Sequence, residues 1–252
     1  MVVSLIVALM LAACSKDTNN SSGNKGNSGE PQSSQSNSGN EASNAPSAEN
    51  AGSGGVLKLA FNIGPVNIGY MPQARTIEET IIGGAVLETL TRFDSAGNFV
   101  PWLAESWEQD VEGKSITYKL RQGVKFQDGS DFNAEAVKWN LDQLLEVGKS
   151  EFSNLLSAEA VDEHTVKLNL KSWDSTMIEK VTNFVWIMSP TSFEQLGKDT
   201  FSKQPVGTGP FVIDRFEQDV VVKYKKFDGY WQAGKPYLDG LEFHIIQDPM
   251  IA

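Results

Sequence analysis

Three short motifs of this chain contain residue types that bind phosphates or nucleotides, but none has the full spacing. The triplets Gly113-Lys114-Ser115 and Gly148-Lys149-Ser150 lack the glycine five residues before the Gly-Lys pair that a phosphate-binding loop requires. The run Gly207-Thr208-Gly209 continues as Pro210-Phe211-Val212, so the third glycine of a dinucleotide-binding turn is missing. The sequence therefore predicts no nucleotide cofactor.

The histidines and carboxylates show no catalytic or metal-binding pattern. His164 and His244 lie far apart, inside segments that favour strands, and no second histidine stands three or four positions from either one. No Gly-x-Ser-x-Gly elbow is present. We expect no metal site, no cofactor and no enzymatic activity. A tethered hydrolase, the alternative from the enzyme class, would need a nucleophile and base pair that the sequence does not show.

Cys14 is the single cysteine of the chain, and its thiol is a group that can be lipidated. The apolar stretch Val2–Leu9 is shorter than the roughly 20 residues that cross a bilayer, which favours a secretory signal. The run Leu11-Ala12-Ala13-Cys14 resembles a bacterial lipobox, whereas a buried core cysteine is the structural alternative. We predict a lipoprotein signal peptide at residues 1–14 and export of the protein with Cys14 as its diacylated membrane anchor.

Residues 15–55 consist mainly of Ser, Asn, Gly, Ala and Pro, without any Val, Ile, Leu, Met or aromatic residue. Such a segment buries too little apolar surface to offset the entropy of ordering, so we expect a disordered tether. The net charge of -11 argues against a nucleic-acid partner, because phosphate binding needs a basic surface.

From Val56 onward the sequence alternates between strand and helix patterns. Alternating apolar residues predict strands at 56–61, 116–120, 166–170, 220–224 and 241–246. Thr76 and Glu79 have capping-box spacing, and the apolar stripe that continues to Leu90 predicts one helix. A second helix is expected after Asn133 as its N-cap. The fold class is a mixed α/β fold in which strands are more common than helices.

Several blocks of the chain occur in an order that is typical of one protein family. They are Pro101-Trp102-Leu103-Ala104-Glu105-Ser106-Trp107, Leu120-Arg121-Gln122-Gly123-Val124-Lys125-Phe126, Pro205-Val206-Gly207-Thr208-Gly209-Pro210-Phe211, Asp228-Gly229-Tyr230-Trp231 and Pro236-Tyr237-Leu238-Asp239-Gly240-Leu241. In order and spacing these blocks are similar to the peptide/oligopeptide/nickel class of extracellular solute-binding proteins, which are the receptors of ABC importers.

The resemblance implies a type II periplasmic-binding-protein fold, in which two lobes close around a cleft. By that template residues 56–89 form the first segment of lobe I, residues 90–201 an inserted subdomain, and residues 202–252 the return to lobe I. The sequence ends at Ala252, where members of the family enter lobe II. We expect only lobe I and its subdomain here, as in a truncated gene or reading frame.

The resemblance also implies a substrate-binding lipoprotein that captures peptides outside the membrane and delivers them to an ABC permease. Nickel, haem-like and sugar ligands stay open as alternatives. We expect a monomer, lipid-anchored at the extracytoplasmic face of the bacterial cell membrane. The alternative function is a truncated, non-transporting surface protein or co-receptor fragment.

Five residues are the candidate ligand contacts. Asn67 and Tyr70 lie in the loop after the first strand, where members of the family approach their ligand. Thr208 and Gly209 lie in a tight loop that would present backbone groups to the cleft. Trp186 fits either a cleft wall or a position in a core strand.

Overall fold

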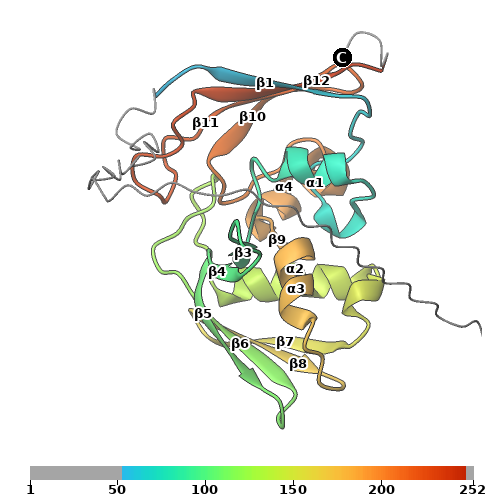
Figure 1. The fold of residues 1–252 in the computed structure, drawn as a ribbon, viewed down its shortest axis with the longest axis vertical. Coiled ribbons are helices and arrows are strands. Elements are labelled where there is room, and N and C mark those ends of the chain that lie inside the picture. The colour runs from blue at the N-terminus through green and yellow to red at the C-terminus, as the bar shows by residue number, and fades with distance from the viewer. Residues whose placement is uncertain (1–52, 248–252) are drawn as a thin grey trace, which may run out of the picture. The chain divides into compact units, whose positions relative to one another are not determined.

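Two four-stranded sheets organise the part of the chain that the structure, a computed structural model, describes, which is residues 53–247 (Figure 1). The predicted signal peptide 1–14 with Cys14, and the predicted tether up to residue 52, lie outside the described residues. The strands are β1 Val56–Phe61, β2 Glu88–Thr89, β3 Thr91–Phe93, β4 Phe99–Pro101, β5 Ala104–Asp110, β6 Ser115–Leu120, β7 Leu155–Asp162, β8 Thr165–Leu170, β9 Trp186–Ile187, β10 Phe211–Glu217, β11 Val221–Lys226 and β12 Gly240–Ile245. The helices are α1 Ile77–Gly83, α2 Ala134–Glu146, α3 Met177–Phe184 and α4 Pro190–Phe201, with short 3-10 turns at Met71–Gln73 and Ser150–Phe152.

The first sheet joins the beginning of the described chain to its end, in the order β1-β12-β11-β10, and we call it the mixed sheet. β1 runs parallel to β12, with Val56 opposite Gly240 and Phe61 opposite Ile245. β12, β11 and β10 then pair antiparallel. The predicted strands 56–61, 220–224 and 241–246 are confirmed to within a residue or two at their ends.

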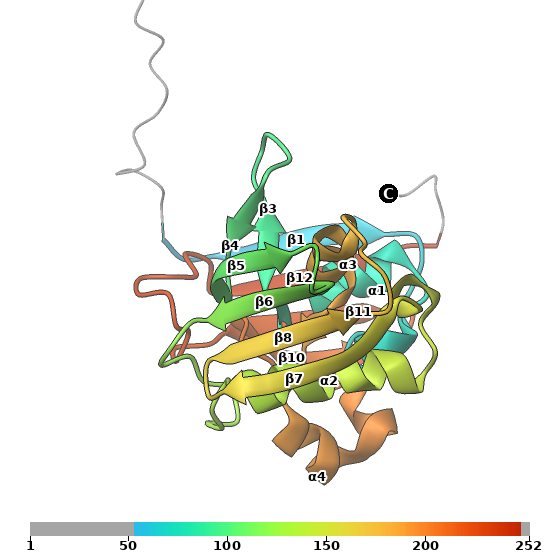
Figure 2. The same ribbon diagram turned by 90° about the horizontal axis from the view of Figure 1, so that it is seen from below.

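The second sheet is antiparallel throughout, in the order β5-β6-β8-β7 (Figure 2). α2 and α3 contribute buried side chains to the core of this sheet, including Val137, Leu141 and Val181. The predictions for 116–120 and 166–170 are confirmed as β6 and β8. Asn133 is the N-cap of α2, as its position predicted, and its side chain accepts a hydrogen bond from the Ala136 amide at 3.0 Å.

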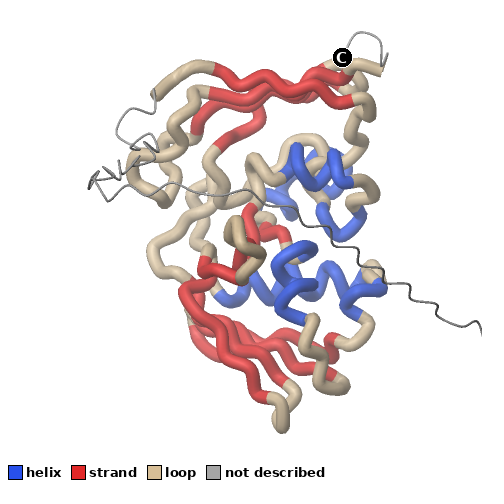
Figure 3. Tube along the Cα trace, viewed as in Figure 1, coloured by secondary structure: helices blue, strands red, loops and turns tan. Residues whose placement is uncertain are grey.

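A second core includes side chains from the mixed sheet and from the helices α1 and α4, and Figure 3 shows helices lying between the two sheets. Phe211, Val222 and Phe243 point into it from the mixed sheet, and Phe201 comes from the end of α4. The end of α4 thus shares a core with the mixed sheet, and the helix also contacts α2.

The helix predicted to continue to Leu90 is shorter than its apolar stripe indicated. α1 ends at Gly83, and the chain turns and enters β2 at Glu88. The helix ends at the pair Gly83-Gly84, where Gly84 is the C-cap and glycine is a poor helix former, and an added Cβ at Gly83 would lie 2.5 Å from the carbonyl oxygen of Ile68. Thr76 is confirmed as the N-cap, because its hydroxyl accepts a hydrogen bond from the Glu79 amide at 3.2 Å, whereas the Glu79 carboxylate accepts from the Arg75 amide at 2.7 Å. A stripe that looked helical is therefore divided between a helix and a buried strand.

Candidate functional site

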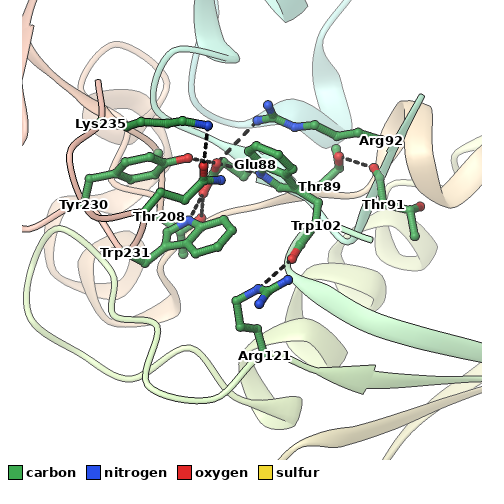
Figure 4. A network of polar contacts seen from close by, with 12 residues as sticks. Glu88, Thr89, Thr91, Arg92, Trp102, Arg121, Thr208, Tyr230, Trp231 and Lys235 are labelled. Carbon is green, nitrogen blue, oxygen red and sulfur yellow. Dashed lines mark hydrogen bonds and ion pairs between the residues drawn. The ribbon is translucent and has the colours of Figure 1, made fainter. Parts of the chain in front are cut away.

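Glu88 in β2 is completely buried, and four neutral donors and one guanidinium surround its carboxylate (Figure 4). Its Oε1 atom accepts hydrogen bonds from Trp102 Nε1 at 2.7 Å and from the Tyr230 hydroxyl at 2.8 Å. Its Oε2 atom accepts from Trp231 Nε1 at 2.8 Å and from Thr208 Oγ1 at 2.9 Å. Because both oxygens already accept two hydrogen bonds, Glu88 has no free position for a ligand or a transferred proton.

The charge of this carboxylate is balanced by Arg92, whose Nη2 atom lies 3.4 Å from Glu88 Oε1. The guanidinium also stacks 3.6 Å above the Trp102 ring, which favours a cation. Burial lowers the pKa of Arg92, an effect that Glu88 opposes, and an arginine stays protonated at physiological pH. Burial, together with the negative charge of Glu88, raises the pKa of Tyr230, so the phenol stays a donor. The Glu88 network is thus a structural centre.

The Glu88 network fastens residues 227–238 to the antiparallel sheet. Trp231 meets Trp102 edge to face, with ring centres 5.5 Å apart, and Arg121 lies 4.9 Å from the centre of the Trp231 ring. Arg121 Nε also donates to the Trp102 carbonyl at 3.0 Å. Residues from β3 and from connecting segments next to both four-stranded sheets therefore converge on one buried carboxylate.

A groove with a volume of about 420 Å³ opens between α1 and α3, and we call it the α1–α3 groove. Its apolar wall includes the exposed side chain of Ile77, which is 75% accessible, with Phe184 and Trp186. Its full lining is Met71, Ala74, Arg75, Thr76, Ile77, Thr80, Ile81, Lys149, Glu151, Asn183, Phe184 and Trp186. The volume falls in the range of small-ligand sites, and the mixture of aromatic and charged groups suits an organic solute.

Three charged residues line the α1–α3 groove. Arg75 is exposed, and the Lys149 ammonium lies 5.6 Å from the centre of the Phe184 ring. Within residues 53–247 neither cation takes part in an ion pair. Glu151 accepts a hydrogen bond from the Ser150 hydroxyl at 3.0 Å, and a backbone hydrogen bond followed by that hydroxyl lowers its pKa. The groove therefore presents two cations and one carboxylate.

Buried hydrogen bonds fix the backbone on both sides of the groove. On one side the buried carboxylate of Glu79 accepts hydrogen bonds from the amides of Arg75 at 2.7 Å and Asn67 at 3.0 Å. On the other side the hydroxyls of Thr91 and Thr182 lie 2.6 Å apart, and Thr182 donates to the Ile178 carbonyl at 2.8 Å. These buried contacts fix α3 and hence the position of the groove wall.

Of the five predicted contacts, Trp186 lines the groove. Its Nε1 atom donates to the Asn183 carbonyl at 3.0 Å, and its backbone pairs with Thr89 of β2. Trp186 therefore lies in the strand β9 and also lines the groove, although these two positions were alternatives in the sequence analysis. A Cβ at Gly84 would lie 3.2 Å from the indole, so a glycine there gives the ring its room.

The other predicted contacts lie outside the groove lining, and Asn67 lines a neighbouring depression that also includes Arg75. The Asn67 side chain closes its own loop, accepting from the Tyr70 amide at 2.8 Å and donating to the Tyr70 carbonyl at 2.7 Å. Tyr70 is buried, and its hydroxyl donates to Gln143 at 3.0 Å. Thr208 belongs to the Glu88 network, and the Gly209 amide donates to the Val86 carbonyl at 2.8 Å. The structure brings Thr208 and Gly209 together, away from the groove lining.

The prediction from the sequence missed Glu88 and the charged lining of the groove. Glu88 stands in the run Val86-Leu87-Glu88-Thr89-Leu90, and a single carboxylate among apolar residues was a signal of a buried acid. Arg75 and Lys149 lie in loops 74 residues apart, with no local spacing that would join them. No group of three or more metal-ligating side chains occurs within the described residues.

The comparisons with known proteins give one consistent family. Residues 98–252 match the bacterial extracellular solute-binding proteins, family 5. The chain is 43% identical over 152 residues to the glutathione-binding protein GsiB of Shigella flexneri, covering 58% of this chain and 30% of GsiB.

Two solved structures share the fold. An ABC transporter substrate-binding protein from Sinorhizobium meliloti has a TM-score of 0.67 at 30% identity, covering 78% of this chain and 40% of that one. DppA from Helicobacter pylori, in complex with the peptide STSA, has a TM-score of 0.69 at 25% identity, covering 79% and 44%.

This chain therefore belongs to the bacterial extracellular solute-binding proteins of family 5. Its mixed α/β fold is that of type II periplasmic binding proteins, and the family is extracytoplasmic. The chain spans about a third of the length of GsiB and 40 to 44% of the two solved proteins. In residues 53–247 no helix combines the length and the apolar character needed to cross a bilayer.

Proposed function

We propose that this chain belongs to a substrate-binding lipoprotein of an ABC importer that captures peptides and delivers them to a membrane permease. Family membership supports a binding role. GsiB is named for glutathione and DppA was crystallised with a peptide, and both facts support a peptide-like ligand. The observation that carries the proposal is the α1–α3 groove, which combines an apolar wall with charges of both signs. A peptide carries both charged termini and apolar side chains, so it matches this lining.

The proposal assigns the groove a role as one wall of the ligand site, with Ile77 and Trp186 as apolar contacts. Ile77 supports this role because a side chain that is 75% accessible contributes little to folding. Burying it against a ligand would supply on the order of 1 kcal/mol of binding free energy. We also propose that a second lobe closes over this wall, which fits the partial coverage of the related chains.

The proposal extends to location and organisation. Lipidation of Cys14 would hold the protein at the extracytoplasmic face, as a monomeric receptor rather than an enzyme. Lobe I would comprise residues 56–89 and 202–252, around residues 90–201 as the inserted subdomain. The parallel pairing of β1 with β12 supports this division, since it joins the two lobe I segments in one sheet.

Isothermal titration of the whole protein with pools of di- and tripeptides, with glutathione and with Ni²⁺ tests the ligand class. We expect heat with at least one peptide pool, weakened about fivefold by Ile77→Ala. Leu156→Ala is the matched control, because Leu156 is a 60% accessible aliphatic residue on β7, outside the groove lining. Absence of heat with every peptide pool and with glutathione would overturn the proposal.

A further inference from the structure

Arg75 and Lys149 are placed so that both can reach a ligand in the α1–α3 groove. Arg75 comes from the segment before α1, and Lys149 from the segment after α2, yet both line this one groove. Their backbones are fixed, since the Arg75 amide donates to Glu79 and the Lys149 amide donates to the Leu144 carbonyl at 3.0 Å. Neither charged end forms an ion pair within the described residues, and the charge of Lys149 contributes to lowering the pKa of the nearby Glu151.

The formal charge of the groove contrasts with that of the chain. The chain carries a net charge of -11, whereas the groove holds two cations against the single carboxylate of Glu151. Lys180, the other cation near Glu151, is already paired with Asp174 at 2.7 Å. Within the groove the cations outnumber the carboxylate, and this local charge favours an anionic ligand against the repulsion from the acidic protein as a whole.

From this arrangement we infer that the site selects acidic peptides, which carry a side-chain carboxylate besides their C-terminus. Arg75 and Lys149 are the specificity-determining residues of this selection. A neutral peptide has one carboxylate and one ammonium, and it would leave one groove cation unpaired. A peptide with a second carboxylate can pair both cations, while Glu151 faces its ammonium. This inference rests on the proposed function and narrows its ligand class.

Arg75 also borders a neighbouring depression lined by Gln73, Lys198 and Lys203, among others. Lys198 there lies 5.8 Å from the centre of the Tyr70 ring. That depression shares Arg75 but has neither Lys149 nor the aromatic wall, and its apolar lining comes from the aliphatic side chains of Ile63 and Val66. The joint contribution of Arg75 and Lys149 distinguishes the groove from it.

Titration of the whole protein with two tripeptide pools tests the inference. The pools are identical except that the middle residue is Glu in one and Gln in the other, so they differ in charge at nearly constant shape. We expect the Glu pool to bind about tenfold more tightly, and Arg75→Gln or Lys149→Gln to reduce this preference by about fivefold each. Arg75→Lys should retain most of it, and Lys225→Gln, an exposed lysine of β11 outside the groove, should retain all of it.

Two further measurements distinguish a direct electrostatic role of Arg75 and Lys149 from a merely structural one. Glu151→Gln removes the one carboxylate of the groove and should increase the preference for the Glu pool. Raising the ionic strength should reduce that preference, since the screening length falls from about 10 Å at 0.1 M to about 3 Å at 1 M salt. Equal affinity for both pools would overturn the inference and leave peptide binding intact, whereas no binding of either pool would overturn both.

Discussion

The carboxylate of Glu88 accepts a hydrogen bond from the indole nitrogen of Trp231 at 2.8 Å, although 143 positions separate the two residues in the chain. This contact joins β2 to the loop before β12, and the same carboxylate also holds Trp102 at the start of the antiparallel sheet. The free energy of unfolding should therefore depend strongly on this one acid.

Replacing Glu88 with alanine should lower the free energy of unfolding by about 3 to 5 kcal/mol. The substitution leaves the half-buried guanidinium of Arg92 without its anion, and it leaves the donors of Tyr230, Trp231 and Thr208 around the buried position without an acceptor. Urea denaturation measures the change, and Glu108→Ala is the control, because Glu108 is an exposed acid of β5. The control should stay within about 0.5 kcal/mol of the unchanged protein. Equal midpoints for the two variants would mean that the Glu88 network adds no stability.

Replacing Thr182 with valine should cost about 1 to 2 kcal/mol and loosen α3. The Thr182 hydroxyl donates to the Ile178 carbonyl and lies 2.6 Å from the Thr91 hydroxyl, so valine leaves a buried hydroxyl without its partner. Hydrogen exchange should then become faster in α3 than in α2. Thr200→Val, at an exposed position of α4, should change neither quantity. Unchanged exchange in α3 would contradict the role of this threonine pair in holding the groove wall.

Replacing Gly209 with alanine should destabilise the protein by about 3 kcal/mol or more. A Cβ there would lie 2.5 Å from the carbonyl oxygen of Val86 and 2.9 Å from that of Ala85, and backbone atoms cannot move aside easily. Gly129→Ala is the comparison, since its Cβ meets open space and only its positive φ of 86° is unfavourable, at a cost of about 1 kcal/mol. Thermal unfolding of both variants measures which substitution lowers stability more. A smaller loss of stability for Gly209→Ala than for Gly129→Ala would refute the close approach at Gly209.

The stability conferred by Asp128 should disappear in acid. Burial alone would raise the pKa of Asp128, but hydrogen bonds from the hydroxyls of Ser130, Ser189 and Ser192 lower it below its usual value. A carboxyl group with a lowered folded pKa stabilises the fold above its unfolded pKa of about 3.9, and the effect is lost as pH falls through the folded value. The stability difference between the natural protein and Asp128→Asn should therefore be full near neutral pH and shrink below about pH 4. Urea titrations across this range check it, and a difference that is constant with pH would count against the assignment.

The elements that the sequence predicted correctly are those whose signal is local. β6, β8 and α2 each show their own period of apolar residues, and Asn133 marks the first turn of α2 through its side chain. α1 was extended too far because its apolar stripe continues past Gly83-Gly84, the glycine pair at which the helix ends. Periodicity reports which face of an element is buried, but not which segment will pack against it.

The candidate site was less predictable for the same reason. Trp186 was included because an aromatic residue in an apolar run suits a wall, and it does line the groove. Thr208 looked suited to a ligand because it stands between two glycines, yet those glycines let the chain approach Val86 and bring the threonine to Glu88. Arg75 and Lys149 meet only in the folded chain, so no spacing rule could have paired them.

The parallel pairing of β1 with β12 imposes an order on biosynthesis. Val56 leaves the ribosome early, but its partner Gly240 is made only after the whole antiparallel sheet. That sheet needs nothing beyond Leu170 for its four strands, so it can form while β1 still has no partner strand on either edge. Closing so long a loop is slow compared with local pairing. The nascent chain therefore carries an unpaired apolar strand through most of its translation, and export machinery or a chaperone that covers residues 56–61 would prevent intermolecular strand pairing.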